Sequence, residues 1–198
     1  MKSKLIFDKA THTYYLDGVE IPSVTQVIPR PDFSFVNPDV LETARIEGNK
    51  MHGKIETYFE YQDTFDDPDL IDLDRLFKEN KELIGDFVCS EKMFSYDGKY
   101  PFAGTPDTVF TKAIIDFKRT PPDKSMAALQ FAGYNKLCLF NQMEYTENWL
   151  LCYQTKTGWR FKNVFNGFSG KIFEKCLEKY YHEKEINLYL NNKGKNYV

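Results

Sequence analysis

The sequence predicts a mixed α/β fold of the α+β kind, with a central mixed β-sheet flanked by helices. The first observation is the order of expected elements: a long helix precedes three strands, a helix, a pair of strands and a last helix. The second is size, because 198 residues with 42% apolar content can bury one good core. We therefore expect a single domain over residues 1–198, with an N-terminal hairpin extension over about residues 1–36.

The N-terminal extension begins with a hairpin signal. Residues 12–16 alternate along a strand, Asp17-Gly18 supplies a tight turn, and residues 19–21 resume the strand pattern. Ser23 and Gln26 have the spacing of a capping box, which predicts a short helix directly after the hairpin. The prolines that follow are expected to end this helix.

The remaining elements follow from helix caps, turn residues and hydrophobic periodicity. Asn37-Pro38 is a favourable helix start, with Asn as the N-cap and proline in the first turn, and the helix is expected to reach about Tyr61. Asp123 is expected to cap a helix that reaches Phe140. The other expected elements are a helix over residues 70–84, strands over residues 87–96 and 100–102, a strand pair over residues 149–154 and 159–164, and a terminal helix over residues 170–190.

The most informative part of the chain is a second hairpin, in which Thr111-Lys112 connects two apolar strands. A two-residue connection pairs Asp107 directly with Asp116, and opposed residues hold their Cβ atoms roughly 4.5–5.5 Å apart. Alternation along the strand places Lys118 on the same face as Asp116. Two carboxylates so close repel each other unless a cation lies between them. The hairpin therefore predicts a site for a hard divalent cation, with a lysine beside it.

These motifs resemble the core of the PD-(D/E)XK nuclease superfamily. Pro106-Asp107 and Asp116-Phe117-Lys118 match its signature, and Gln130 with Tyr134 matches the helix of its RecB-like exonuclease branch. Residues 45–56 resemble the glycine-and-histidine helix of the same branch, and the resemblance runs from about Thr11 to Tyr153. It implies a restriction-endonuclease-like core and phosphodiester hydrolysis with one or two Mg²⁺ or Mn²⁺ ions as cofactors.

The resemblance also implies a set of metal ligands, namely Asp107, Asp116, the carbonyl of Phe117, His52 and Glu91. In the family the lysine, here Lys118, orients or deprotonates the attacking water and stabilises charge on the phosphate. Glu91 raises a conflict of register. A two-residue turn at Asp97-Gly98 would pair Glu91 with Gly104 and point it away from Asp107, unless a bulge near Pro101 or Gly104 restores it.

The other candidate residues have weaker assignments. Arg45, His52 and Glu56 lie along one helix face, so that Arg45 could contact DNA and Glu56 could orient His52 from behind. Gln130 and Tyr134 either orient the lysine and hold the DNA strand, or are a polar helix residue and a core tyrosine. Arg119 could clamp a phosphate or be a surface charge at a strand end.

Composition sets further bounds. The net charge of −3 argues mildly against non-specific DNA binding, although the chain is acidic over residues 63–86 and more basic after Lys156. No cysteine pair has C-x-x-C spacing, and the four cysteines lack the grouping that holds an iron–sulfur cluster in some RecB-like proteins, so no such cluster is expected. Without a signal peptide or a run of eighteen apolar residues, we expect a soluble protein without membrane association, in the cytoplasm of a bacterial or phage-infected cell.

We therefore expect a metal-dependent deoxyribonuclease, most specifically an exonuclease. The N-terminal hairpin followed by residues 22–25 resembles phage recombination-type and mitochondrial genome-maintenance exonucleases, which implies single-stranded DNA or duplex ends as substrate. Partners would be DNA and proteins of replication, recombination or repair. Two alternatives stay open, a structure-specific or restriction-type endonuclease and a catalytically quiet nucleic-acid-binding module. The sequence leaves RNA cleavage, digestion polarity and oligomeric state undetermined.

Overall fold

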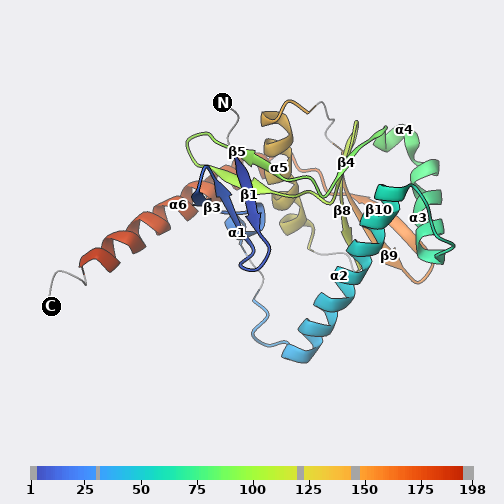
Figure 1. The fold of residues 1–198 in the computed structure, drawn as a ribbon, viewed down its shortest axis with the longest axis horizontal. Helices are drawn as coiled ribbons and strands as arrows, with labels where there is room; N and C mark the ends of the chain where they lie inside the picture. Colours follow the sequence, from blue (N-terminus) through green and yellow to red (C-terminus); the bar gives the residue numbers. More distant parts are fainter. Residues whose placement is uncertain (1–3, 30–31, 120–122, 144–147, 194–198) are drawn as a thin grey trace.

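A computed structural model describes residues 4–29, 32–119, 123–143 and 148–193 of the chain (Figure 1). Its centre is a five-stranded sheet with the order β10-β9-β8-β7-β4. The strands are β4 (Phe87–Ser90), β7 (Thr108–Phe110), β8 (Ala113–Lys118), β9 (Asn148–Thr155) and β10 (Gly158–Asn163). Strands β8 and β9 are parallel, and the other neighbours are antiparallel. The mixed α/β fold with a central mixed sheet and flanking helices is thus confirmed.

Helices cover both faces of this sheet (Figure 1). On one face lie α5 (Lys124–Phe140) and the first half of α6 (Ser169–Lys193), which share an apolar cluster with Ile114 of β8. On the other face lie α2 (Pro38–Tyr61) and α3 (Pro68–Glu79), which pack with Ile115 and Phe117. Successive residues of β8 therefore alternate between two cores, as buried strands do. Asp116 shares the parity of Ile114 and faces α5.

A smaller sheet precedes this core. It contains β1 (Leu5–Asp8), β2 (Thr13–Leu16) and β3 (Val19–Ile21), all antiparallel. The hairpin of β2 and β3 is confirmed, whereas β1 was not predicted. The short helix α1 (Val24–Val27) follows with the predicted capping box of Ser23 and Gln26. The backbone of Pro22 then accepts a hydrogen bond from Ala103 in β6 (Phe102–Gly104), which pairs with β5 (Phe94–Tyr96).

The predicted helix bounds hold where local capping decides them. Asn37 caps α2 by accepting a hydrogen bond from the Asp39 amide at 2.8 Å, and Asp123 caps α5 in the same way. The single helix predicted over residues 70–84 is wrong, because the structure divides it into α3 and α4 (Lys81–Ile84). Asn80 lies at the break, where its amide group donates to the Leu76 carbonyl at 2.8 Å. A side chain that bonds to the preceding turn in this way closes a helix.

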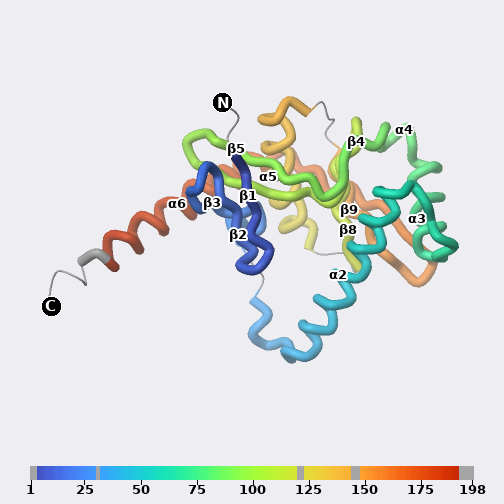
Figure 2. Tube along the Cα trace, viewed as in Figure 1, coloured from blue at the N-terminus to red at the C-terminus, as the bar shows by residue number. Residues whose placement is uncertain are grey.

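Helix α6 leaves the body of the molecule in its second half (Figure 2). Over the described ranges, no helix combines the length and the apolar character needed to span a membrane.

Candidate functional site

Asp107 and Asp116 lie side by side at the carboxyl end of β8. The β7–β8 register pairs Thr108 with Ile115 and Val109 with Ile114, as the two-residue connection predicted. Continuing that register places Asp107 beside Asp116, just before β7 begins. Oδ2 of Asp107 accepts a hydrogen bond from the Phe117 amide at 2.7 Å, which fixes the carboxylate across the strand. The hairpin thus holds both carboxylates on rigid backbone.

Glu91 reaches this site by leaving its strand. The register predicted for it is wrong, since Phe94 pairs with Gly104 and the residues between β5 and β6 form a longer loop. Glu91 instead follows the end of β4 with a left-handed backbone of φ 47°, and its amide donates to the Asp107 carbonyl at 3.0 Å. Ser90 Oγ donates to the same carbonyl at 2.9 Å. A left-handed non-glycine residue is costly and typical of functional sites.

Helix α2 brings His52 close to the carboxylates of Asp107 and Glu91. Its Nδ1 lies 3.6 Å from Oδ2 of Asp107 and 4.0 Å from Oε1 of Glu91. The three residues each offer one ligand atom, and these atoms all lie within 4.8 Å of one another. This group is a candidate metal site, and we call it the metal centre. An imidazole with two carboxylates is a donor set suited to a divalent cation, with several positions left for water or substrate.

Asp116 is held from two sides. Its side chain is only 1% exposed, and Oδ1 accepts a hydrogen bond from Gln130 Nε2 at 3.0 Å. Oδ2 forms an ion pair with Lys118 Nζ at 2.5 Å and accepts no hydrogen bond of good geometry from the described residues. Gln130 also donates to Tyr134 Oη at 3.1 Å. The helix pair of Gln130 and Tyr134 therefore orients a carboxylate, and Lys118 is oriented by that same carboxylate.

The other candidates lie around this centre. Arg45 pairs with Glu42 on the exposed surface of α2, and Arg119 pairs with Glu47 of the same helix. Glu56, exposed on α2, lies near enough to act electrostatically on Glu91. The Phe117 side chain points into the core that α2 covers, so this residue reaches the site through its backbone alone. Their roles in binding DNA or metal stay predictions.

The centre holds more negative charge than its own cations neutralise. Burial, together with Asp107 and Glu56, raises the pKa of Glu91 to about 8. Burial and the neighbouring Asp116 likewise raise the pKa of Asp107. Burial alone would lower the pKa of Lys118, but Asp116 and Asp107 outweigh it, so the pKa lies above its ordinary value and the ammonium keeps its proton. A cation bound beside such carboxylates favours their ionised form and lowers their pKa values.

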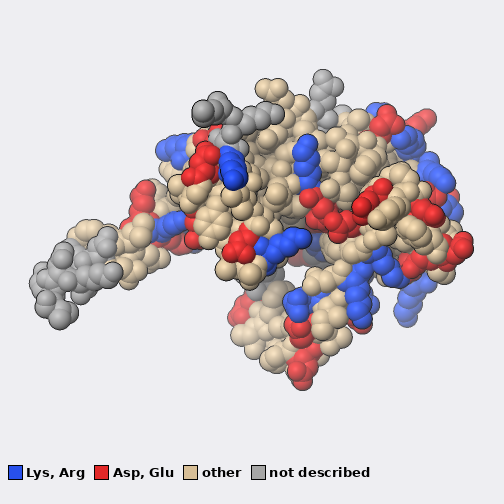
Figure 3. Space-filling model, in the orientation of Figure 1, with Lys and Arg blue, Asp and Glu red and all other residues tan. Residues whose placement is uncertain are grey.

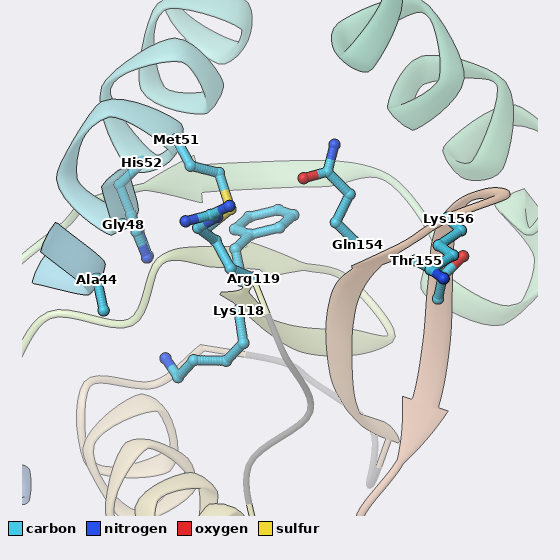
Figure 4. Close-up of a pocket in the computed structure, with 10 residues that line it drawn as sticks. Ala44, Gly48, Met51, His52, Lys118, Arg119, Gln154, Thr155 and Lys156 are labelled. Atoms are coloured by element: carbon cyan, nitrogen blue, oxygen red, sulfur yellow. The ribbon is translucent and has the colours of Figure 1, made fainter. Parts of the chain in front are cut away.

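A cavity of about 720 Å³ opens beside the metal centre, under α2. Figure 4 shows His52 extending into it from α2, and the side chains of Lys118 and Arg119 leaving the end of β8 in different directions. Lys156 lies at its far wall, and no Asp or Glu is among the described residues that line it. We call it the cationic cavity. The visible face of the molecule mixes basic and acidic side chains and is hollowed beside α2 (Figure 3), so local charge matters here more than net charge.

Sequence reasoning overlooked some supporting residues. Ser90 holds the Asp107 carbonyl, and only its place before Glu91 could have pointed to it. Thr105, two residues before Asp107, forms a hydrogen bond of 2.7 Å between its hydroxyl and that of Tyr14. This contact joins residues far apart in the chain, and no local pattern could have shown it.

Comparison with known proteins adds little to this geometry. No family model and no curated protein matches the chain. One solved structure, described as the crystal structure of SSO0001, is similar at 15% identity with a TM-score of 0.35. The similarity covers 64% of this chain and 68% of that chain. This likeness is too weak to indicate a shared fold or function.

Proposed function

We propose that this protein is a metal-dependent deoxyribonuclease of the PD-(D/E)XK type, and an exonuclease of the RecB-like branch. One observation carries the proposal: His52, Glu91 and Asp107 converge on one point, with Asp116 and Lys118 directly beside them. These residues come from elements far apart in the sequence. The substrate is single-stranded DNA or a duplex end, and the activity serves replication, recombination or repair.

The donor chemistry of the site fits a divalent cation. Asp116 Oδ2 is buried and lies 2.5 Å from the Lys118 ammonium, so an ion bound there would share this oxygen with Lys118. In the proposal Asp107, Asp116 and Glu91, with the Phe117 carbonyl, supply the oxygen ligands and His52 supplies a nitrogen. Mg²⁺ favours oxygen ligands and water, whereas the imidazole makes Mn²⁺ an equally suitable ion. The site would hold one or two such ions.

In this proposal the bound ion and the side chains of the site have separate roles in hydrolysis. A bound divalent ion lowers the pKa of the attacking water and offsets the charge of the scissile phosphate. The Lys118 ammonium donates hydrogen bonds to the water or to a phosphate oxygen, and its raised pKa suits stabilisation of negative charge. Gln130 keeps Asp116 in place during the reaction. The cationic cavity receives the phosphate backbone through Lys118, Arg119 and Lys156.

The decisive experiment incubates the purified protein with end-labelled linear DNA and with closed circular single-stranded DNA. Each substrate is tested with Mg²⁺, with Mn²⁺ and with EDTA, beside an Asp116→Ala variant. Asp86→Ala is the matched control, since Asp86 is an exposed carboxylate paired with Lys81 outside the site. Metal-dependent loss of linear DNA only, abolished in Asp116→Ala, supports the exonuclease. Cutting of the circle favours an endonuclease, and binding without any cleavage favours a quiet binding module.

A further inference from the structure

The small N-terminal sheet is fixed directly against the loop that carries Asp107. The Tyr14 hydroxyl bonds to that of Thr105 at 2.7 Å, and the Ala103 amide donates to the Pro22 carbonyl at 2.9 Å. Tyr14, Leu16 and Ile21 also bury their side chains against Ala103. Because Thr105 lies only two residues before Asp107, the sheet has a fixed position relative to the metal centre.

A second cavity, of about 520 Å³, is lined by residues of this sheet and by Glu91 of the metal centre. We call it the N-terminal pocket. One wall is aromatic: the Phe7 ring lies 5.1 Å from that of His12, edge to face, and 4.6 Å from that of Tyr14. The lining also includes Glu56 and Tyr134. His12 is exposed and has a left-handed backbone of φ 57°, a conformation that a non-glycine residue seldom adopts.

The two cavities have complementary chemistry and meet at the metal centre. His52 lines the cationic cavity, whereas Glu91 lines the N-terminal pocket, and their side chains approach to 4.0 Å. The cationic cavity offers the charges that a phosphate backbone needs. The N-terminal pocket offers aromatic rings with Lys9 as its one Lys or Arg among the described lining residues, which suits a base more than a run of phosphates.

We propose that the N-terminal pocket binds the terminal nucleotide of the DNA strand, with its base stacked against Phe7 and His12. The backbone of the rest of the strand then lies in the cationic cavity, and the phosphate between the two nucleotides lies at the metal centre. The pocket volume falls in the range of roughly 300–1,000 Å³ typical of small-ligand sites, which suits a single nucleotide better than a duplex. This inference rests on the proposed nuclease function, and it gives a physical reason for preferring a strand end.

The test measures where a strand stacks when it binds. The probe is a short single-stranded oligodeoxynucleotide that carries a fluorescent purine, quenched by stacking, either at one of its ends or at an internal position. The oligonucleotide is mixed with the Asp116→Asn variant, in which cleavage is limited. It is also mixed with two double variants, Asp116→Asn with Phe7→Ala and Asp116→Asn with His12→Ala. Tyr15→Ala is the matched control, because Tyr15 is the neighbour of Tyr14 on β2 and points to the opposite face of the sheet.

We expect quenching of the purine at one end only. Adding His12→Ala or Phe7→Ala should reduce this quenching and weaken binding by about fivefold to a hundredfold, the usual effect of removing one stacking ring. His12 is exposed, so its replacement leaves the fold intact even if Phe7→Ala lowers stability. Tyr15→Ala should change neither quantity.

Four results would overturn the inference, and the first three do so without contradicting the nuclease proposal. Equal quenching at internal and terminal positions would show that the N-terminal pocket does not bind the terminal base, and so would terminal quenching that survives both pocket variants. In either case cleavage by the wild-type protein would still support a nuclease. A loss of quenching in Tyr15→Ala as large as that in His12→Ala would show a general effect of the sheet. Absence of both DNA binding and cleavage in the wild-type protein would remove both proposals.

Discussion

Two regions of this molecule hold carboxylates in opposite ways. On the flank where α3 meets α2 and β10, each carboxylate has its own partner. Asp67 accepts from Lys54 Nζ at 2.6 Å, and Asp72 accepts from the Trp159 amide at 2.6 Å and pairs with Arg75. Lys54 lowers the pKa of Asp67. Burial would raise the pKa of Asp72, but the Trp159 amide and Arg75 outweigh it and lower the pKa.

The metal centre shows the reverse. Glu91 and Asp107 have raised pKa values, and the described cations that face them are Lys118 and, when protonated, His52. The residue types are the same on the flank and in the centre, so the difference lies in how many partners the fold supplies. A carboxylate with a hydrogen-bond donor for each oxygen stabilises the folded protein. A cluster of carboxylates with too few donors destabilises it, because the charges repel one another. Such a cluster is a mark of a functional site.

The two regions should differ most in their effect on catalytic activity. Asp116→Asn removes one negative charge from the centre, and we expect it to lower kcat/KM for linear DNA by about a hundred- to a thousandfold or more. Asp72→Asn alters the flank by the same chemical change and should leave kcat/KM near that of wild type. Steady-state cleavage of labelled DNA measures both. Equal kcat/KM in the two variants would contradict a catalytic role for the metal centre.

Metal binding gives the next largest effect. Mn²⁺ at a hundredfold excess over its Kd should stabilise the folded protein by about 2.7 kcal/mol, which for a domain of this size raises Tm by about 5–10 °C. His52→Ala and Glu91→Gln should reduce this rise, whereas Asp67→Asn should lower the starting Tm and keep the rise. Thermal unfolding with EDTA and with Mn²⁺ gives these values. A rise unaffected by His52→Ala and Glu91→Gln would place the ion elsewhere.

Stability without metal should show the flank's contribution. Asp72→Ala leaves the Trp159 amide without its acceptor, and we expect the free energy of unfolding to fall by about 1–3 kcal/mol. Glu91→Gln should cost less, or even stabilise the metal-free protein, because near neutral pH the carboxyl of Glu91 must take up a proton on folding and glutamine need not. Urea denaturation in EDTA measures both variants. A larger loss for Glu91→Gln than for Asp72→Ala would contradict the comparison.

The last prediction is a pH dependence of stability that has opposite sign in the two regions. The pKa of Glu91 rises from 4.5 to about 8 on folding, so between these values the folded protein keeps a proton that the unfolded chain has lost. Its contribution to stability therefore falls as pH rises through that window. Asp67 has a lowered pKa, so its contribution is present above the ordinary value of 3.8 and is lost as pH falls below it.

This sign can be measured as a difference between variants. In EDTA, raising the pH from about 5 to about 8 should destabilise wild type more than Glu91→Gln. The deficit of Asp67→Asn relative to wild type should be constant over that range and should shrink only in acid. Parallel wild-type and Glu91→Gln profiles would show that Glu91 titrates normally.

The sequence alone determined those elements whose causes are local. The start of α2 at Asn37-Pro38, the capping box before α1 and the start of α5 after Asp123 each depend on hydrogen bonds within one turn of helix. The β7–β8 register depends on a two-residue connection, and it sufficed to place Asp107 beside Asp116. These features could be predicted because neighbouring residues supply all the interactions that fix them.

Only the tertiary structure decided how the site is completed. Glu91 points to Asp107 because its backbone leaves β4 and bonds to a carbonyl from another segment. Gln130 reaches Asp116 only when α5 packs on the sheet. Phe7 and His12 belong to no functional motif, and they line a pocket at the site because Tyr14 bonds to Thr105, 91 residues away in the chain. Contacts of this kind arise from the packing of whole elements, so no window of sequence contains the groups that determine them.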